Sequence, residues 1–154
     1  DPKARHGQMK LVDTNVLLYA VDELSEHHRP AREWIETTLS TGSRVLFPWI
    51  VLVGFIRLST GRSFMADPLE PGEAVSLVED WLAPSSASVP VPDREHIARM
   101  SSLLAATGTG GNIVNDAHLA AIALQYDAEV ISFDNDFSRF PGVRWKQPAQ
   151  TSGR

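Results

Sequence analysis

The sequence contains no cysteine, which excludes disulfide bonds, thiolate nucleophiles and cysteine-ligated zinc. It also lacks a long hydrophobic run. The longest nearly apolar stretch, residues 45–56, spans 12 residues and contains Pro48 and Gly54, whereas a membrane-spanning helix needs about 20 apolar residues. We therefore expect a protein that does not enter a membrane and that works in the cytoplasm.

Basic residues are fewer than acidic residues: the chain has 14 Lys and Arg against 19 Asp and Glu, which gives a net charge of −5. This balance argues against a protein that wraps nucleic acid by charge alone, because such binding depends on many phosphate contacts from Lys and Arg. It does not exclude an enzyme that acts on nucleic acid. Metal-dependent nucleases gather carboxylates in one site, and a few arginines beside that site are enough to hold phosphate.

The 154 residues, of which 43% are hydrophobic, are typical of one soluble domain that buries about 70% of its unfolded surface. We expect this domain to span residues 9–147. Residues 1–8 have no apolar segment of a secretory signal, so we expect them to be an extension foreign to the natural protein, with Met9 as its start. Residues 148–154 are expected to form a polar tail.

Short apolar segments alternate with segments of helical periodicity along the chain. This alternation predicts an α/β fold of three layers, α/β/α, with a central and mainly parallel sheet. A glycine-rich loop at residues 107–112 lacks the ending of a phosphate-binding P-loop. Strands are predicted at residues 10–12, 45–47, 89–91, 129–133 and 143–145; helices at 16–21, 30–39, 49–60, 71–82, 93–104 and 115–126, with one helical turn at 136–140.

Three aspartates stand at positions where chemistry is expected. Asp13 and Asp134 each follow an apolar strand, and ligands of open α/β sheets gather at the carboxyl ends of strands. Asp116 begins a helix that is apolar on nearly every side, where a carboxylate must be neutralised, hydrogen-bonded or metal-bound. Asp136, two residues after Asp134, is close enough to share a cation with it.

Each aspartate alone also has a structural interpretation. Asp13 suits a helix N-cap, Asp116 suits an exposed first turn facing the helix dipole, and Asp134 suits an Asx turn. Capping does not explain all of them together. Oxygen ligands without cysteine favour Mg²⁺ or Mn²⁺ over zinc.

The aspartates lie in three motifs that resemble those of PIN-domain ribonucleases: VDTNVLL at residues 12–18, NDAHLAAIA at 115–123 and ISFDNDF at 131–137. Two further segments, FIRLST at 55–60 and FPGV at 140–143, resemble the VapC toxins of toxin–antitoxin modules, especially the mycobacterial-type subgroup. The resemblance runs from about residue 9 to residue 145.

This resemblance implies a PIN-like α/β/α fold and an endoribonuclease that hydrolyses RNA to products with a 5′-phosphate. It implies that Asp13, Asp116 and Asp134 are catalytic and, with Asp136, hold one or two Mg²⁺ or Mn²⁺ ions. It also implies a homodimer and a cognate VapB-type antitoxin that blocks the site. The predicted substrate-binding residues are Thr14, Asn15, Arg57 and Asn115.

The sequence departs from the family pattern at Gly54, where many members carry a glutamate. Asp136 or a water molecule are the two candidates for the missing ligand. The departure keeps open a second hypothesis, a catalytically weakened PIN-like module that binds RNA or protein. A phosphatase of the haloacid dehalogenase type is disfavoured, because Asn15 stands where that class needs a second aspartate.

The histidines share no metal-ligand spacing, which favours structural or surface roles for His27, His28, His96 and His118. Arg57 follows a buried helical stretch and is a candidate phosphate clamp, against the alternative of a solvated side chain.

Overall fold

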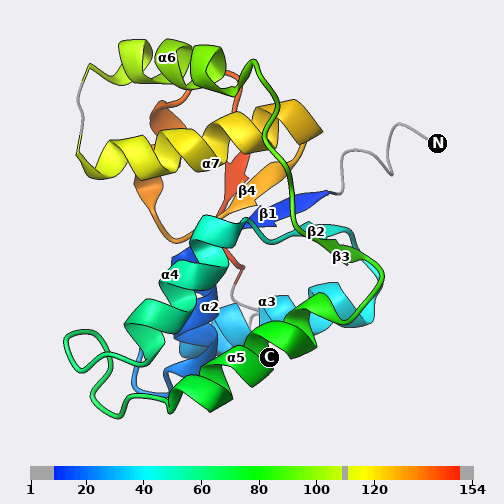
Figure 1. Ribbon diagram of the computed structural model, residues 1–154, viewed down its shortest axis with the longest axis vertical. Helices are drawn as coiled ribbons and strands as arrows, with labels where there is room; N and C mark the ends of the chain where they lie inside the picture. Colours follow the sequence, from blue (N-terminus) through cyan, green and yellow to red (C-terminus); the bar gives the residue numbers. More distant parts are fainter. Residues whose placement is uncertain (1–8, 109–110, 150–154) are drawn as a thin grey trace.

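A computed structural model describes residues 9–108 and 111–149. At its centre is a parallel sheet of five short strands in the order β3-β2-β1-β4-β5 (Figure 1). The expected extension at residues 1–8, residues 109–110 of the glycine-rich loop and residues 150–154 of the expected tail lie outside the described residues. The strands are β1 (Lys10–Val12), β2 (Val45–Leu46), β3 (Ala87–Ser88), β4 (Glu129–Ile131) and β5 (Trp145–Lys146).

Helices cover both faces of the sheet, which confirms the predicted three-layer fold. In Figure 1, α6 and α7 lie on one side of the sheet, and the other four α-helices lie on the opposite side. Within the described residues, no helix has the length and apolar character required to cross a membrane. The helices are α2 (Thr14–Val21), α3 (His28–Ser40), α4 (Trp49–Ser59), α5 (Pro71–Leu82), α6 (His96–Thr107) and α7 (Asn112–Tyr126), followed by the 3₁₀ helix η1 (Asn135–Arg139).

The core is built from apolar strand residues and from the sheet-facing sides of the helices. Phe47, Phe55 and Phe137 are among its largest fully buried side chains. The ring of Phe55 meets that of Trp81 edge-to-face with centroids 4.9 Å apart, which packs α4 against α5. The core thereby fixes the helices whose ends approach the carboxyl edge of the sheet.

The strand order changes direction at β1, which pairs with β2 on one side and with β4 on the other. The register aligns Val12 with Ile131, and the Asp13 N–H donates to the Ile131 carbonyl at 3.0 Å. The segments that follow β1 and β4 therefore emerge side by side. In open parallel sheets this switch point is where ligands bind.

Two predicted strands were wrong in position. The edge strand β3 covers Ala87–Ser88 rather than residues 89–91, because Pro90 has no N–H to donate to a neighbouring strand. The last strand, β5, covers Trp145–Lys146 rather than residues 143–145. Both edges nevertheless pair parallel to their neighbours.

Four helix starts also differ from the prediction: α2 and α3 each begin two residues earlier, α6 begins later and α7 begins earlier. Asp93 is not the N-cap of α6, as its position suggested: the helix begins at His96, and the Asp93 carboxylate accepts from the Glu95 N–H and pairs with Arg99. Helix α7 begins at Asn112, three residues before the predicted start, after Gly111 with φ +71°. This earlier start places Asp116 in the second turn of the helix.

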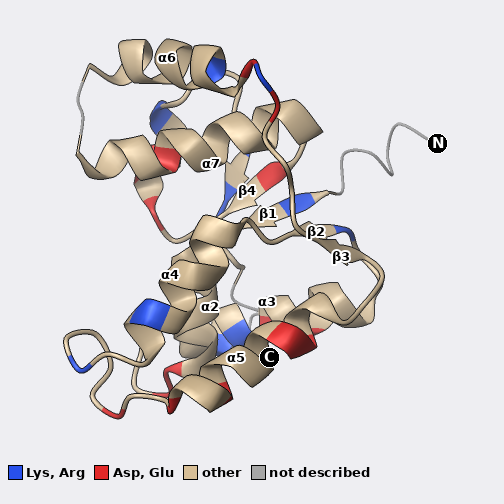
Figure 2. Ribbon diagram, in the orientation of Figure 1, with Lys and Arg blue, Asp and Glu red and all other residues tan. Residues whose placement is uncertain are grey.

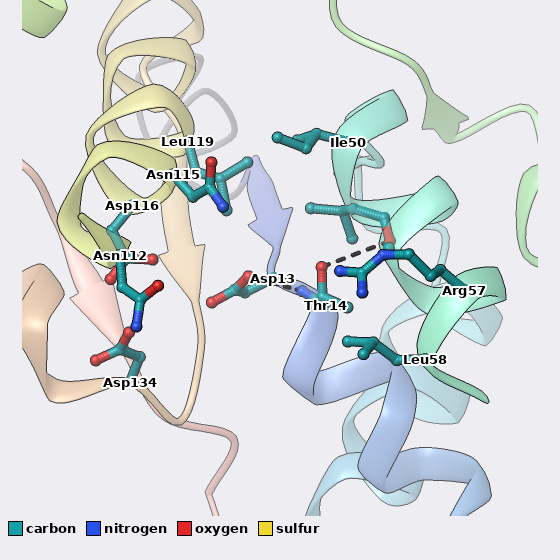
Figure 3. A pocket seen from close by; sticks show the side chains of 12 residues that line it. Asp13, Thr14, Ile50, Arg57, Leu58, Asn112, Asn115, Asp116, Leu119 and Asp134 are labelled. Carbon is teal, nitrogen blue, oxygen red and sulfur yellow. Dashed lines mark hydrogen bonds between the residues drawn. The ribbon is translucent and has the colours of Figure 1, made fainter. Parts of the chain in front are cut away.

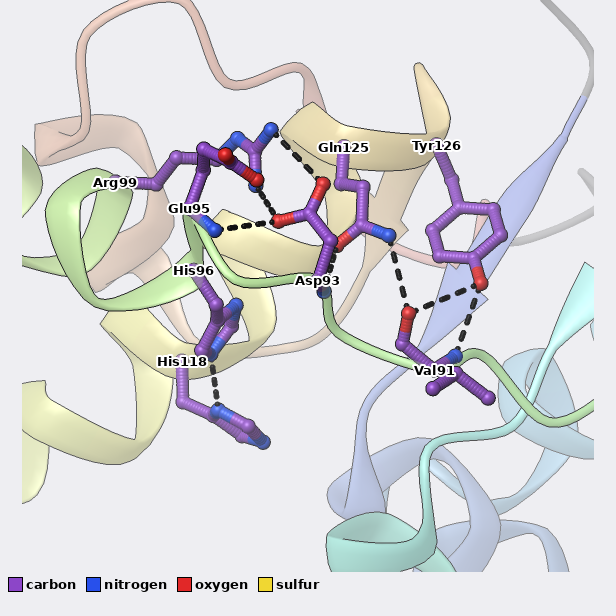
Figure 4. Close-up of polar contacts among 8 residues, drawn as sticks. All are labelled: Val91, Asp93, Glu95, His96, Arg99, His118, Gln125 and Tyr126. Atoms are coloured by element: carbon purple, nitrogen blue, oxygen red, sulfur yellow. Dashed lines mark hydrogen bonds and ion pairs between the residues drawn. The ribbon is translucent and has the colours of Figure 1, made fainter.

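Helix α6 is held on α7 by polar contacts (Figure 4). His96 Nε2 and His118 Nδ1 are 2.8 Å apart, and Gln125 and Tyr126 of α7 bind the backbone of Val91 in the preceding loop. The pair of rings agrees with the structural role predicted for His96 and His118.

Candidate active site

Asp13 is both the N-cap of α2 and a member of the site. Its Oδ1 accepts from the Thr14 N–H at 2.7 Å, and its Oδ2 accepts from the Ser132 hydroxyl at 2.7 Å. Burial raises the pKa of Asp13 above its ordinary value, although the bonds from Ser132 and Thr14 oppose the shift. The capping interpretation is thus confirmed, and Asp13 also lines the cavity described below.

Ser132, a residue that the sequence alone did not single out, organises the carboxyl ends of β1 and β4. Its hydroxyl donates to Asp13 and accepts from the Asn15 amide at 3.1 Å and from the Asp134 N–H at 3.0 Å. The Asn15 Oδ1 accepts from the Phe133 N–H at 3.2 Å. The only sequence signal was a serine between the apolar residues Ile131 and Phe133, and the structure buries this serine fully.

Asn15 and Ser132 therefore fix the loop after β4 to the start of α2. Asn15 is predicted to bind substrate, but its amide is used in these bonds and does not line the cavity described below. Through Ser132 and the Phe133 backbone, Asn15 helps to position Asp13 and the loop that carries Asp134, and its role in substrate binding stays a prediction.

Asp116 lies on the buried side of α7, with 9% of its surface exposed. The interpretation of Asp116 as an exposed first-turn residue is wrong, because α7 begins one turn earlier than the sequence suggested. Burial, a hydrogen bond with Asp134 and the neighbouring carboxylate charges raise the pKa of Asp116 to about 8. Without a cation, this carboxyl group therefore holds a proton at neutral pH.

Asp116, Asp134 and Asp136 form the carboxylate cluster, in which one oxygen from each residue lies within 4.8 Å of the others. The two residues from the loop after β4 are held locally, because Asp134 caps η1 by accepting from the Asp136 N–H at 2.9 Å. Asp13 is outside this group of three, but its charge also raises the pKa of Asp116.

A cavity of about 330 Å³ opens between α7 and α4 at this edge of the sheet. Figure 3 shows Asp116 and Asp134 on one side of it, Asp13 near the centre and Arg57 on the α4 side. Of the predicted site residues, Asp136 and Asn15 do not line it, while Asn112 lines it without having been predicted. The lining residues are Asp13, Thr14, Ile50, Val51, Gly54, Arg57, Leu58, Asn112, Asn115, Asp116, Leu119 and Asp134.

Gly54 lines the same cavity from α4, so the position at which the resemblance leads us to expect a glutamate faces the site. A Cβ at Gly54 would lie 3.4 Å from Thr14 Oγ1 and 3.5 Å from Thr14 Cγ2, which are ordinary van der Waals contacts. The glycine is therefore not required by close packing.

The residues present fit a hard divalent cation. Carboxylate oxygens from α7 and from the segment after β4 converge, and burial together with the neighbouring carboxylates raises the pKa of Asp116. A cation bound at the cluster would compensate the negative charge of these carboxylates.

Comparison with known families agrees with this geometry. The PIN domain family model matches residues 10–143. Ribonuclease VapC37 of Mycobacterium tuberculosis is 48% identical over 140 residues, which cover 91% of this chain and 97% of the relative. This chain belongs to the PIN domain family. Ribonuclease VapC33 of the same species is 34% identical over 140 residues, covering 91% of this chain and 98% of the relative.

Solved structures share the fold of this PIN domain at low sequence identity. VapBC-1 from nontypeable Haemophilus influenzae aligns with a TM-score of 0.66 at 19% identity, over 92% of this chain and 99% of that one. Mycobacterium tuberculosis VapC20, described as a sarcin-ricin loop cleaving toxin, aligns with a TM-score of 0.61 at 19% identity, over 88% of this chain and 98% of that one.

The raised pKa of Asp116 predicts how the stability of the metal-free PIN domain depends on pH. The folded protein keeps this proton up to about pH 8, whereas an unfolded aspartate loses it near pH 4, so the free energy of unfolding falls as pH rises between these values. Asp116→Asn removes this contribution. At about pH 8 in chelator, we expect the variant to be more stable than wild type by about 1 kcal/mol.

Thermal unfolding at about pH 5 and about pH 8 measures this difference, with Asp80→Asn on the exposed side of α5 as the control. A variant that is less stable than wild type at both pH values would give Asp116 a purely structural role.

Gly54→Glu is expected to lower the Mg²⁺ concentration needed for half-saturation of the site, because it adds a carboxylate to the cavity wall. The position is helical and the Cβ has room, so the variant should also gain up to about 1 kcal/mol of stability from helix propensity. Calorimetric titration with Mg²⁺ measures the first effect and thermal melting the second.

Val53→Glu is the matched control, because Val53 is the exposed neighbour of Gly54 on α4 and does not line the cavity. Equal gains in both variants would mean that only net charge matters, and unfolding of Gly54→Glu would contradict the available space.

Proposed function

We propose that this PIN domain is a Mg²⁺- or Mn²⁺-dependent endoribonuclease and the toxin of a toxin–antitoxin pair. The observation that carries the proposal is the carboxylate cluster at the switch point of the sheet, in a chain 48% identical to a ribonuclease over nearly the full length of both. The reaction would be hydrolysis of an RNA phosphodiester bond, with the 5′-phosphate on one product.

Asp116, Asp134 and Asp136 would hold the cation, and Asp13 would complete the negative site from the end of β1. A divalent cation, when bound, supplies charge that stabilises the reacting phosphate and lowers the pKa of a bound water. The side chains of the protein hold the site in position. Ser132 holds the Asp13 carboxylate by its hydroxyl hydrogen bond and the Asp134 backbone by accepting from its N–H.

Arg57 is suited to bind the substrate phosphate. It stands in the last turn of α4, lines the cavity opposite the carboxylates and forms no ion pair with any residue that the structure describes (Figure 3). Its guanidinium group can therefore pair with a phosphate without breaking an existing bond. Figure 2 shows acidic residues on α7 and after β4, and basic residues at the end of α4 and in the loop after it.

The toxin assignment and the partner follow from the relatives. Structures of this fold include VapBC-1 from Haemophilus influenzae and VapBC2 from Rickettsia felis bound to promoter DNA. By analogy, a VapB-type antitoxin would bind this chain and block the cavity, and the nuclease would act as a homodimer in the cytoplasm. The nuclease domain would span residues 9–147.

A second candidate function is a PIN-like module that binds RNA or protein with weakened catalysis. Gly54 favours it, because the cavity lacks one carboxylate that many family members carry. Cleavage assays distinguish the two functions, since a weakened module would bind RNA without cutting it.

Cleavage of single-stranded RNA is expected to stop in chelator and to return when Mg²⁺ or Mn²⁺ is added, since no cysteine, histidine or lysine lines the cavity to support a metal-free route. Asp13→Asn, Asp116→Asn and Asp134→Asn should each reduce kcat at least about a hundredfold. Gel assays with end-labelled RNA measure both effects. Full activity in chelator would contradict the proposal, and Asp80→Asn is the control.

Arg57→Ala is expected to weaken RNA binding and to reduce the salt dependence of binding by about one unit of slope, because one phosphate contact is lost. The overall slope should be modest, as the chain has few basic residues. Fluorescence anisotropy at several salt concentrations measures it, with Arg32→Ala on the exposed surface of α3 as the control. An unchanged slope would identify Arg57 as a solvated residue.

A further inference from the structure

Two rows of side chains from α7 line the cavity, and the carboxylate cluster uses only one of them. Asn112 and Asp116 are four residues apart and share one helix face, as do Asn115 and Leu119. The first row, Asn112 and Asp116, lies beside Asp134. Figure 3 shows the second row, Asn115 and Leu119, on the part of the cavity that faces Ile50.

Helix α4 is divided in the same way. Ile50, Gly54 and Arg57 recur at helical spacing along the wall opposite α7. Arg57 stands at the carboxyl end of this row and Ile50 at its start. One end of the cavity therefore combines the Asn115 amide with two apolar side chains, while the rest holds the carboxylates and Arg57 together with Asn112 and Leu58.

We propose that Asn115, Ile50 and Leu119 form a nucleobase subsite that holds a base next to the cleaved phosphate and reads its identity. The proposal rests on the proposed endoribonuclease function. Apolar side chains suit the faces of a base, and an amide offers donors and an acceptor to its edge. Within the part of the chain that the structure describes, the Asn115 amide forms no hydrogen bond, so it is free to do so.

The size of the cavity supports the same conclusion. About 330 Å³ is at the lower end of the range for small-molecule pockets, enough for one nucleotide unit and too little for a duplex. Because Asn115 directly precedes Asp116, a base held by Asn115 belongs to a nucleotide beside the carboxylates. The base must then be turned out of a single-stranded segment.

The test is cleavage of a single-stranded RNA pool with about ten random nucleotides between fixed flanks. Sequencing the new 5′ ends gives the base preference at each position around the cut. Wild type should show a preference at a nucleotide adjacent to the cut, and Asn115→Ala should weaken it about tenfold at that position only. Ile50→Ala should slow cleavage of all sequences alike.

Val114→Ala is the control, since Val114 is an exposed neighbour on α7 that does not line the cavity, and it should reproduce the wild-type preference. Two outcomes would overturn the subsite and leave the proposed function standing. In the first, wild type cleaves the pool and Asn115→Ala keeps the full base preference. In the second, wild type cleaves the pool without any base preference beside the cut. If wild type cleaves nothing with Mg²⁺ or Mn²⁺, the proposed function fails and the subsite with it.

Discussion

The burial of Asp116 among neighbouring carboxylates is the constraint on which the site depends. Asp116, Asp134 and Asp136 offer oxygens within 4.8 Å of one another, and Asp13 adds its charge from the end of β1. Such an arrangement costs folding free energy unless a proton or a cation reduces the negative charge. In the metal-free protein a proton on Asp116 does this, as its pKa of about 8 indicates.

The fold maintains this unfavourable arrangement by fixing each backbone segment independently of the charges. Parallel pairing of β1 with β4 brings two strand ends together, and the fully buried Ser132 joins them through three hydrogen bonds. Helix α7 is buried along most of its length by apolar packing, so Asp116 cannot move away from its neighbours. Apolar packing in the core thus keeps these carboxylates close together, in a site that fits a cation.

Much of this organisation was predictable from the sequence, because it depends on local pattern. Apolar runs followed by aspartate located the ends of β1 and β4, and helical periodicity located α4, α5 and α7. The start of α7 was missed because a glycine-rich segment ends in residues that join the helix, and the edge strand β3 was shifted by Pro90. The role of Ser132 required the register of β1 against β4, which a single sequence does not contain.

Gly54 is another position at which the sequence pattern and the tertiary structure give different information. The resemblance of the sequence to the family led us to expect a glutamate at this position, and only the three-dimensional arrangement shows that it faces the cavity with room for a Cβ. The site therefore has an acidic side on α7 and after β4, and an α4 side on which Arg57 is the charged group. This asymmetry suits a phosphate held between a cation and a guanidinium group.

The central claim is that a cation replaces the proton on Asp116. Calorimetric titration of the protein with Mn²⁺ at about pH 7, in two buffers of different ionisation enthalpy, counts the protons released on binding. Because the pKa values of Asp116 and Asp13 are raised, binding of the cation at pH 7 should release protons, and the number released should fall as the pH rises well above 8. Binding at pH 7 without proton release, or no binding, would contradict the account.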